Sequence, residues 1–426
     1  MRKPSIPLLV TVFLVLHVAG VICRAQVQLP DTPAARQCAA WLQAFNRGDR
    51  EAYRDFLQKN FPSRAEHLDQ DLDFRERTGG FELRKVEEST PTKLVALLQE
   101  RLSDQFGRLT LEVEAAEPHR ISNLGLRAIP RPAEFPLSHM SESELTSTLR
   151  KKLEPDAAAG NFAGAVLVSK NGKPIFAEAY GLADREHKIP DTLKTRFRIG
   201  SMNKMFTAVA TLQLVQENKL GLTDPLGKYL TDYPNKDVAA KVTIHELLTH
   251  TGGTGDIFGP EFDAHRLELR TLQDYVKLYG GRAPKYEPGS RWEYSNYGFI
   301  LLGVVIEKVS GESYYDYVRE HIYIPAGMAS TGSEPEDQAV ADRSIGYTKM
   351  GGNSQWQPNT DTLPYRGTSA GGGYSTVEDL LKFANALQEN KLLNAHYTEM
   401  LTTGKAGTPD STYAYGFGDN DSVRWG

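Results

Sequence analysis

The stretch Ser201-Met202-Asn203-Lys204 leads into the sequence MFTAVATLQLV at residues 205–215. This run has almost no polar face, so the pattern predicts a helix that is buried on all sides. A lysine is rare in such a helix because an unpaired ammonium away from water is very costly. Burial also lowers the pKa of a lysine, which makes it a usable base. Ser201 lies three residues before Lys204 on the same helix face, and a serine beside a desolvated lysine is an activated nucleophile. The alternative is that Ser201 only caps the helix.

A second motif of the same chemistry follows at Tyr294-Ser295-Asn296, after the turn signal Pro288-Gly289-Ser290 and before an apolar run at residues 297–306. Tyr294 and Asn296 project to the same side if the loop is extended. A tyrosine hydroxyl can relay a proton, and an asparagine can bond both a lysine and a substrate amide. A further Tyr-x-Asn, Tyr233-Pro234-Asn235, is interpreted as an ordinary turn.

Together these motifs resemble the serine β-lactamase and penicillin-binding-protein superfamily, and most of all its class C β-lactamase-related branch. The resemblance runs from about Gly160 to the last residue. Where a class A enzyme would carry Ser-Asp-Asn, this chain has Tyr-Ser-Asn. Other landmarks follow in the family's order: Phe197-Arg198-Ile199-Gly200, Leu220, Leu222, Asp224-Pro225, residues 243–253, Pro288-Gly289, residues 370–376 and Asp379-Leu380.

The resemblance implies an α+β fold in which an antiparallel sheet packs against a helical subdomain. It also implies acyl transfer, with Ser201 as nucleophile and Lys204 as candidate base. Tyr294 would either share the proton or pass it to the leaving group, and Asn296 would bind substrate. The backbone N–H of Ser201 would stabilise the oxyanion. No metal or organic cofactor is expected.

The chain departs from the family in one respect. A third motif, Lys-Thr-Gly or His-x-Gly on a strand, is expected after the tyrosine motif, yet the chain stops at Gly426 without it. The catalytic domain is therefore expected to be truncated at its C-terminus and to lack its last strands. His250-Thr251-Gly252 resembles the missing motif but precedes Tyr294. We interpret it as the end of a short helix that Thr243 and Glu246 open with a capping box and Gly252-Gly253 end.

The segment from His245 to His250 also resembles a zinc-binding motif. Its histidines are five residues apart rather than four and do not share a helix face, so a zinc site is not expected.

Composition is typical of a soluble globular protein, with 40% hydrophobic and 24% charged residues in 426 positions. The net charge of −5, without long charge runs, gives no indication of a nucleic-acid partner. Only Cys38 lies beyond the N-terminal leader, so no internal disulfide is expected. The expected partner is a small-molecule or peptide substrate.

Residues 1–25 are interpreted as a cleaved signal peptide. Arg2 and Lys3 form a positive start, an apolar stretch follows, and Cys23-Arg24-Ala25 places small residues where cleavage needs them. The protein is therefore expected in the periplasm or outside the cell. An uncleaved membrane anchor is the alternative, although the apolar run is short for a span.

Two domains are predicted beyond this leader. Residues 26–131 combine an amphipathic helix pair, broken near Asp49, with four strand-like runs that begin near residues 81, 93, 107 and 121. This order resembles a nuclear transport factor 2-like fold with an accessory role. A proline-marked linker at residues 132–141 leads to the hydrolase domain at residues 142–426. There, Asn171-Gly172 predicts a β-hairpin.

These observations predict an exported serine hydrolase that forms an acyl-enzyme with a β-lactam, a D-amino-acid peptide or an ester. The alternative is a penicillin-recognising sensor that is acylated without turnover.

Overall fold

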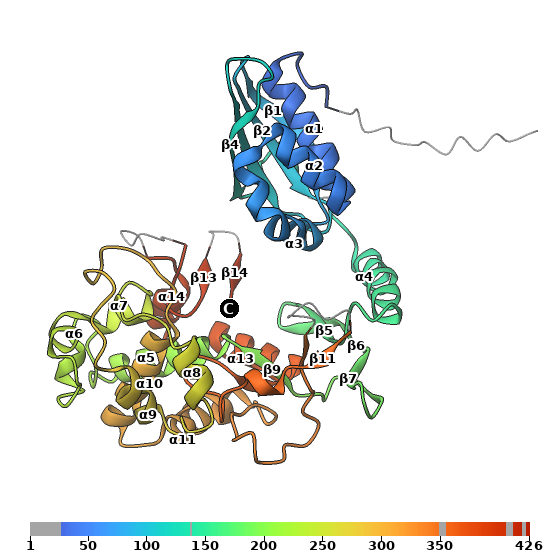
Figure 1. Ribbon diagram of the computed structural model, residues 1–426. Helices are drawn as coiled ribbons and strands as arrows, with labels where there is room; N and C mark the ends of the chain where they lie inside the picture. Colours follow the sequence, from blue (N-terminus) through green and yellow to red (C-terminus); the bar gives the residue numbers. More distant parts are fainter. Residues whose placement is uncertain (1–26, 137–138, 349–354, 406–411, 420–422) are drawn as a thin grey trace, which may run out of the picture. The chain divides into compact units, whose positions relative to one another are not determined.

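The computed structural model describes residues 27–136, 139–348, 355–405, 412–419 and 423–426, so the predicted signal peptide lies outside the described residues. The chain divides into two compact units, Met1–Ser138 and His139–Gly426 (Figure 1). Each unit is built from both helices and strands, which confirms the predicted α+β class. No helix in the described ranges is long and apolar enough to cross a membrane.

The first unit contains an antiparallel sheet whose four strands follow chain order. These strands are β1 (Phe81–Ser89), β2 (Lys93–Glu100), β3 (Phe106–Val113) and β4 (Ile121–Ile129). All four strand-like runs of the sequence are therefore confirmed as strands. Their alternating apolar side chains point to one face, where helix α1 packs against β2 and β3.

The helices of this unit are α1 (Pro33–Arg47), α2 (Arg50–Asn60) and α3 (Leu68–Thr78). Asp49 caps α2 as predicted, because its carboxylate accepts the Ala52 N–H at 2.8 Å. Trp41 and Phe45 are buried in the core of this unit. The resemblance to the nuclear transport factor 2-like fold stays a prediction.

The second unit begins with α4 (Glu142–Ala158) and the predicted hairpin, β5 (Gly164–Lys170) and β6 (Lys173–Tyr180). Asn171 and Gly172 both have positive φ angles, 51° and 72°, as a two-residue type I′ turn requires. Within the described residues, β5 and β6 pair only with each other.

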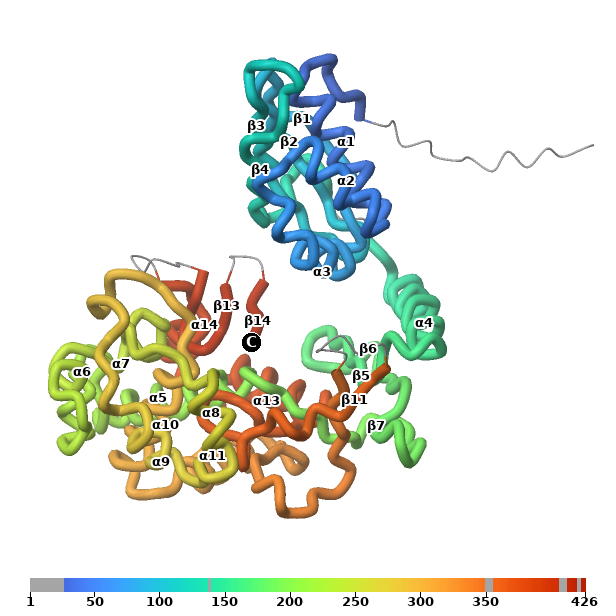
Figure 2. The backbone as a smooth tube through the Cα atoms, in the orientation of Figure 1, coloured from blue at the N-terminus to red at the C-terminus, as the bar shows by residue number. Residues whose placement is uncertain are grey.

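Two buried helices, α5 (Asn203–Gln216) and α10 (Asn296–Ser310), lie side by side at the centre of this unit (Figure 2). Nearly every residue in the first three turns of each helix is buried, which confirms that both runs lack a polar face. Neighbouring helices enclose them: α7 (Ile244–Leu248), α9 (Leu272–Tyr279), α11 (Tyr314–Val318) and α14 (Ala395–Thr402).

A short strand pair sets the start of α5. Strand β9 (Phe197–Gly200) runs antiparallel to β12 (Gly373–Ser375), with Gly200 opposite Gly373. The Gly372 N–H also donates to the Gly200 carbonyl at 3.1 Å. This pairing places Ser201, the next residue, beside the segment that precedes β12.

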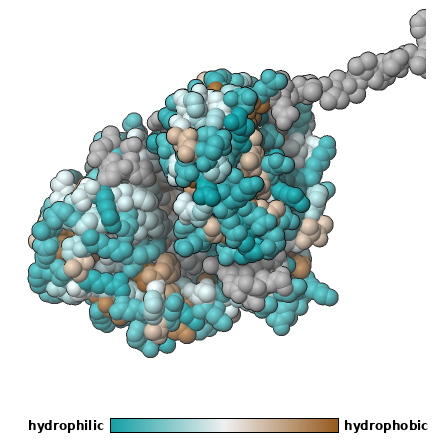
Figure 3. Space-filling view, turned by 45° about the horizontal axis from the view of Figure 1, so that its top comes forward, coloured by the Kyte–Doolittle hydropathy of each residue, from teal (hydrophilic) through white to brown (hydrophobic). Residues whose placement is uncertain are grey.

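The second unit contains further elements, most of them short; the 12-residue helix α13 (Val377–Gln388) is an exception and contributes Phe383, Ala386 and Leu387 to the core. The short elements include α6 (Lys236–Lys241), α8 (Pro260–His265), α12 (Ile324–Ala326), β7 (Leu182–Asp184) with β8 (Ile189–Pro190), β10 (Tyr347–Thr348) with β11 (Gln357–Pro358), and β13 (Gly418–Asp419) with β14 (Arg424–Trp425). On the face shown in Figure 3, hydrophobic residues are scattered among hydrophilic ones, as is normal for a globular surface.

Candidate active site

Ser201 lies in the turn between β9 and α5, one residue before the helix cap, rather than inside the helix. The Lys204 N–H donates to the Ser201 carbonyl at 3.0 Å, and this tight turn brings both side chains to the same side. Helix α5 has no side-chain cap, so the alternative of a purely capping serine is wrong. The Ser201 side chain is exposed, whereas Lys204 is only 1% exposed.

The Lys204 ammonium nitrogen has three oxygen neighbours. It lies 2.7 Å from Asn296 Oδ1, 2.5 Å from the Ala370 carbonyl oxygen and 3.2 Å from Ser201 Oγ. The first two groups can only accept hydrogen bonds, so they hold two N–H bonds. In a neutral amine the third position carries the lone pair, and that position faces the Ser201 hydroxyl.

Burial lowers the pKa of Lys204 to about 7, and the carboxylate of Asp256 offsets part of this effect. The ammonium also faces the rings of Tyr294 and Phe299, with centroids at 4.7 and 5.5 Å. An appreciable fraction of this lysine is therefore a neutral amine near neutral pH.

Tyr294 completes the contacts of the serine. Its hydroxyl donates to Ser201 Oγ at 2.8 Å. Burial raises the pKa of Tyr294, the hydrogen bond to Ser201 partly opposes this, and the charge of Asp256 adds to the rise. The phenol is thus neutral and can donate a proton. The backbone at Ser295 is extended, with φ −135° and ψ 113°, so Tyr294 and Asn296 project to one side as predicted.

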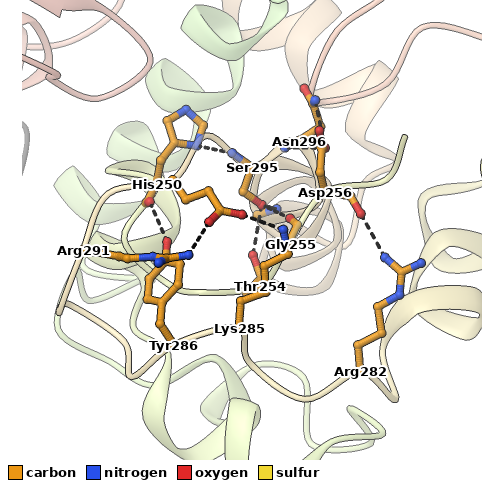
Figure 4. A network of polar contacts seen from close by, with 12 residues as sticks. His250, Thr254, Gly255, Asp256, Arg282, Lys285, Tyr286, Arg291, Ser295 and Asn296 are labelled. Atoms are coloured by element: carbon orange, nitrogen blue, oxygen red, sulfur yellow. Dashed lines mark hydrogen bonds and ion pairs between the residues drawn. The ribbon is translucent and has the colours of Figure 1, made fainter. Parts of the chain in front are cut away.

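Asp256 orients the side chain of Asn296. One carboxylate oxygen of Asp256 accepts the Asn296 side-chain N–H at 2.9 Å and its backbone N–H at 3.2 Å. The amide nitrogen of Asn296 therefore faces Asp256, and its oxygen must face Lys204. Arg282 in turn donates to the Asp256 carbonyl at 2.9 Å (Figure 4). Sequence reasoning missed Asp256 because a lone aspartate in a glycine-rich loop carries no pattern.

The helix before His250 ends differently from the prediction. The capping box of Thr243 and Glu246 is confirmed, but the left-handed residue that ends α7 is His250, with φ 60°, rather than Gly252 or Gly253. The Thr251 N–H donates to the Glu246 carbonyl at 2.9 Å, which is the wide hydrogen bond of a Schellman motif. A non-glycine residue is strained in this conformation by about 1–2 kcal/mol, so the contacts of its side chain must outweigh this strain.

His250 holds the segment that carries Tyr294. Its carbonyl accepts the Glu293 N–H at 3.0 Å. Its Nδ1 accepts the Ser295 N–H at 3.1 Å (Figure 4). Because Nδ1 is an acceptor, Nε2 carries the proton and faces the Tyr413 hydroxyl at 2.9 Å. The imidazole also lies against the Tyr294 ring, with centroids 4.4 Å apart. Burial lowers the pKa of His250 to about 3, so the ring is neutral.

We expect His250→Asn to lower the free energy of unfolding by about 1–3 kcal/mol, because the Tyr413 hydroxyl loses its partner Nε2 and the ring packing against Tyr294 is lost. Asparagine tolerates the left-handed conformation, so backbone strain is not the cause of the loss. His245→Asn is the matched control, since His245 contacts Tyr415 and does not touch the tyrosine motif. Urea unfolding of both variants tests this prediction, and equal losses would contradict it.

A cavity of about 370 Å³ opens beside Ser201. Ser201, Asn296 and the backbone of Gly200 and residues 370–372 form its polar side, and its other side is mostly apolar. The Ser201 backbone N–H has no acceptor within the described ranges and is available to an oxyanion. The four residues singled out from the sequence are thus brought together around Ser201 and Lys204, and two of them, Ser201 and Asn296, line this cavity.

The sequence model of one protein family, described as Beta-lactamase, matches residues 149–421. Among individual proteins, the chain is similar to the Putative penicillin-binding protein PbpX of Bacillus subtilis (strain 168), with 34% identity over 258 residues. These residues cover 60% of this chain and 62% of that relative, so less than two thirds of the relative is spanned.

Solved structures show the same likeness. A penicillin-binding protein from Bacillus halodurans matches with a TM-score of 0.57 and 36% identity, covering 64% of this chain and 85% of that one. A D-stereospecific amidohydrolase from Streptomyces sp. matches with a TM-score of 0.54 and 29% identity, covering 66% and 85%. The predicted superfamily and the β-lactamase-like fold of the second unit are thus confirmed.

Proposed function

Because this chain belongs to the β-lactamase family, we propose that it is an exported serine hydrolase that acts through an acyl-enzyme on an amide or ester. The carrying observation is the position of Ser201 Oγ, 3.2 Å from a buried lysine nitrogen and 2.8 Å from the hydroxyl of a half-buried tyrosine. A nucleophile held between a base and a proton donor is the arrangement that acyl transfer requires. Export is proposed from the leader sequence alone.

Lys204 is the general base of this proposal. Asn296 and the Ala370 carbonyl hold two of its hydrogens, and the lone pair of the neutral amine faces the Ser201 hydroxyl. When Ser201 Oγ attacks the substrate carbonyl, Lys204 takes its proton. A base works best when its pKa lies near the working pH, and a pKa of about 7 meets this condition.

Tyr294 is the proton donor to the leaving group. Its raised pKa keeps the phenol protonated until the scissile bond breaks, and its hydroxyl already points at Ser201 Oγ, next to the reacting carbon. Lys204 keeps the serine proton as an ammonium, and Tyr294 is left as a phenolate. Water then attacks the acyl-enzyme, Tyr294 takes a proton from that water, and the Lys204 ammonium protonates Ser201 Oγ as the ester bond breaks.

Asn296 and the Ser201 N–H position the substrate. One of the two amide N–H bonds of Asn296 is used by Asp256, and the other is available to a substrate carbonyl. The Ser201 N–H points to the developing oxyanion at the start of α5, where the helix dipole also favours negative charge.

The names of relatives favour a penicillin and a D-amino-acid amide or peptide as substrates. A simple ester is a third candidate, because the same acyl-enzyme chemistry cleaves esters. The test is a hydrolysis panel on the intact protein with a penicillin, a peptide ending in D-Ala-D-Ala and a short-chain ester. We expect many turnovers per protein molecule on at least one of them. Formation of one equivalent of stable adduct without turnover would contradict the hydrolase function and favour the alternative, a penicillin-recognising sensor. No adduct and no turnover would overturn both.

A further inference from the structure

A second cavity, of about 410 Å³, adjoins the cavity beside the nucleophile. Strand β9 contributes Arg198 to the second cavity and Gly200 to the first. In the same way, Phe262 on α8 lines the first cavity, and Arg266, just after this helix, lines the second. Leu363 lines both. Because three separate segments pass from one cavity to the other, the two cavities are neighbours.

Arginine side chains outnumber carboxylates in the second cavity. Both oxygens of Glu336 pair with Arg198, one of them at 2.6 Å, and Glu336 also lies 3.2 Å from Arg343. Arg266 forms no ion pair with the described residues, and its Nη1 donates to the Leu363 carbonyl at 2.8 Å. Three positive charges and one negative charge leave a net charge of +2 on the side chains that line this cavity, although the whole chain carries −5.

This positive charge is only partly screened, and no further carboxylate lines the cavity among the described residues. The side chains of Arg198 and Arg343 are 19% and 14% exposed, so water and salt screen them less than surface charges. The chain 349–354, which lies outside the described residues, contains no acidic residue. Acidic residues in the segments that form the cavity are exposed and do not line it: Asp263, Asp337, Asp342 and Asp361. An anion from outside the chain can therefore balance the excess charge.

The chemistry of the cavity favours a carboxylate as this anion. A guanidinium is planar, and its paired N–H donors match the two oxygens of a carboxylate. Glu336 and Arg198 already form such a two-oxygen pair in this cavity. Arg266 uses one N–H for the Leu363 carbonyl, so its other N–H bonds are available to a second carboxylate.

The spacing between this cavity and the nucleophile follows from strand β9. Arg198 precedes Ser201 by three residues, and an extended chain advances about 3.3 Å per residue, so the arginines lie on the order of 10 Å from Ser201. None of them lines the cavity beside the nucleophile. Tyr294, which donates to the leaving group in the proposed mechanism, lines neither cavity, so the acyl part of a substrate is the part that extends past Leu363 toward the arginines.

We propose that the second cavity is a subsite for a carboxylate on the acyl part of the substrate, about 10 Å from the scissile carbonyl, and that Arg266 binds this carboxylate beside the pair of Arg198 and Glu336. This assignment rests on the proposed hydrolase function and specifies its substrate class. It makes Arg266 a residue that determines specificity, without a part in bond breaking.

The experiment uses p-nitrophenyl monoesters of adipic, suberic and sebacic acid, which differ in the distance between the ester and the free carboxylate. Each monoester is compared with the same molecule in which that carboxylate is a methyl ester. The release of p-nitrophenol by the intact protein gives the rate of acylation even where the acyl-enzyme is stable. We expect the charged ester of one chain length to exceed its neutral partner in kcat/KM by about 10-fold, the ratio that about 1.4 kcal/mol produces. An equal ratio at all three lengths would indicate long-range attraction only and would overturn the inference.

Arg266→Met should bring this ratio close to one. A merely structural role of Arg266, through the Leu363 carbonyl, would lower the rates on both esters and leave their ratio unchanged. Arg270→Met is the matched control and should keep the wild-type ratio, because it removes the same charge from an exposed arginine that stacks on Tyr365 and does not line the cavity. A wild-type ratio near one, or a preference that survives Arg266→Met, would overturn this inference and leave the hydrolase function intact. Absence of acylation by every ester would overturn both.

Discussion

Replacement of Ser201 by alanine is expected to abolish covalent labelling of the protein by a fluorophosphonate or penicillin probe. Ser201 Oγ contacts both the Lys204 nitrogen and the Tyr294 hydroxyl, at 3.2 and 2.8 Å. The other groups in the described site are poor candidates, because an asparagine or a protonated tyrosine is a poor nucleophile and Lys204 is only 1% exposed. Removal of a nucleophile of this type has cost about 10⁶-fold in rate in a well-studied serine protease.

Mass spectrometry of the labelled intact protein gives the readout, and peptide mapping locates the adduct. Ser313→Ala is the control, since Ser313 is a serine that caps α11 at a distance from the site. It should label at the wild-type rate. An adduct that persists in Ser201→Ala and maps to another residue would show that a different nucleophile operates, and the proposed function would fail with it.

The central part of this site could be predicted from sequence because its signals are local. A lysine in a run without a polar face must be buried, and α5 shows Lys204 to be 1% exposed. Alternate residues of an extended loop share one side, and this rule places Tyr294 with Asn296. The hairpin at Asn171-Gly172 and the strands of the first unit were likewise predictable, since turn chemistry and alternation act over a few residues.

The supporting residues could not be predicted, because they depend on contacts between segments far apart in the chain. Asp256 orients Asn296 across 40 positions, and the Ala370 carbonyl reaches Lys204 across 166. The sequence predicts that Gly252-Gly253 end this helix, because glycine is the residue that most readily adopts the left-handed conformation. The structure has His250 in that conformation. Its side-chain contacts to Ser295, Tyr413 and Tyr294 stabilise the strained conformation instead, and local propensity does not include them.

The protonation state of Lys204 is expected to control the rate at which Ser201 is acylated. Acylation of Ser201 is expected to accelerate as pH rises through about 7, because only the neutral amine can take the serine proton. Lys204→Arg should lose about 10³-fold or more in acylation rate, since a guanidinium stays protonated at all accessible pH values. The arginine variant should also lack the rise near pH 7. Stopped-flow measurement of the labelling rate between pH 5.5 and 9 tests both statements, because this range extends more than about one pH unit to each side of the pKa of about 7.

The same shift in pKa predicts how stability depends on pH. Burial lowers the pKa of Lys204 from 10.5 to about 7 in the folded protein, so between these values the unfolded chain binds a proton that the folded chain does not. The free energy of unfolding therefore rises with pH in this window, by about 1.4 kcal/mol per pH unit from this group, and the contribution is flat below pH 7. Lys204→Met removes the titrating group. The difference in unfolding free energy between wild type and Lys204→Met, measured in urea at pH 7, 8 and 9, should thus change in favour of the wild type as pH rises. A difference that stays constant with pH would mean that Lys204 is charged in the folded protein, and it could not then act as the base for Ser201.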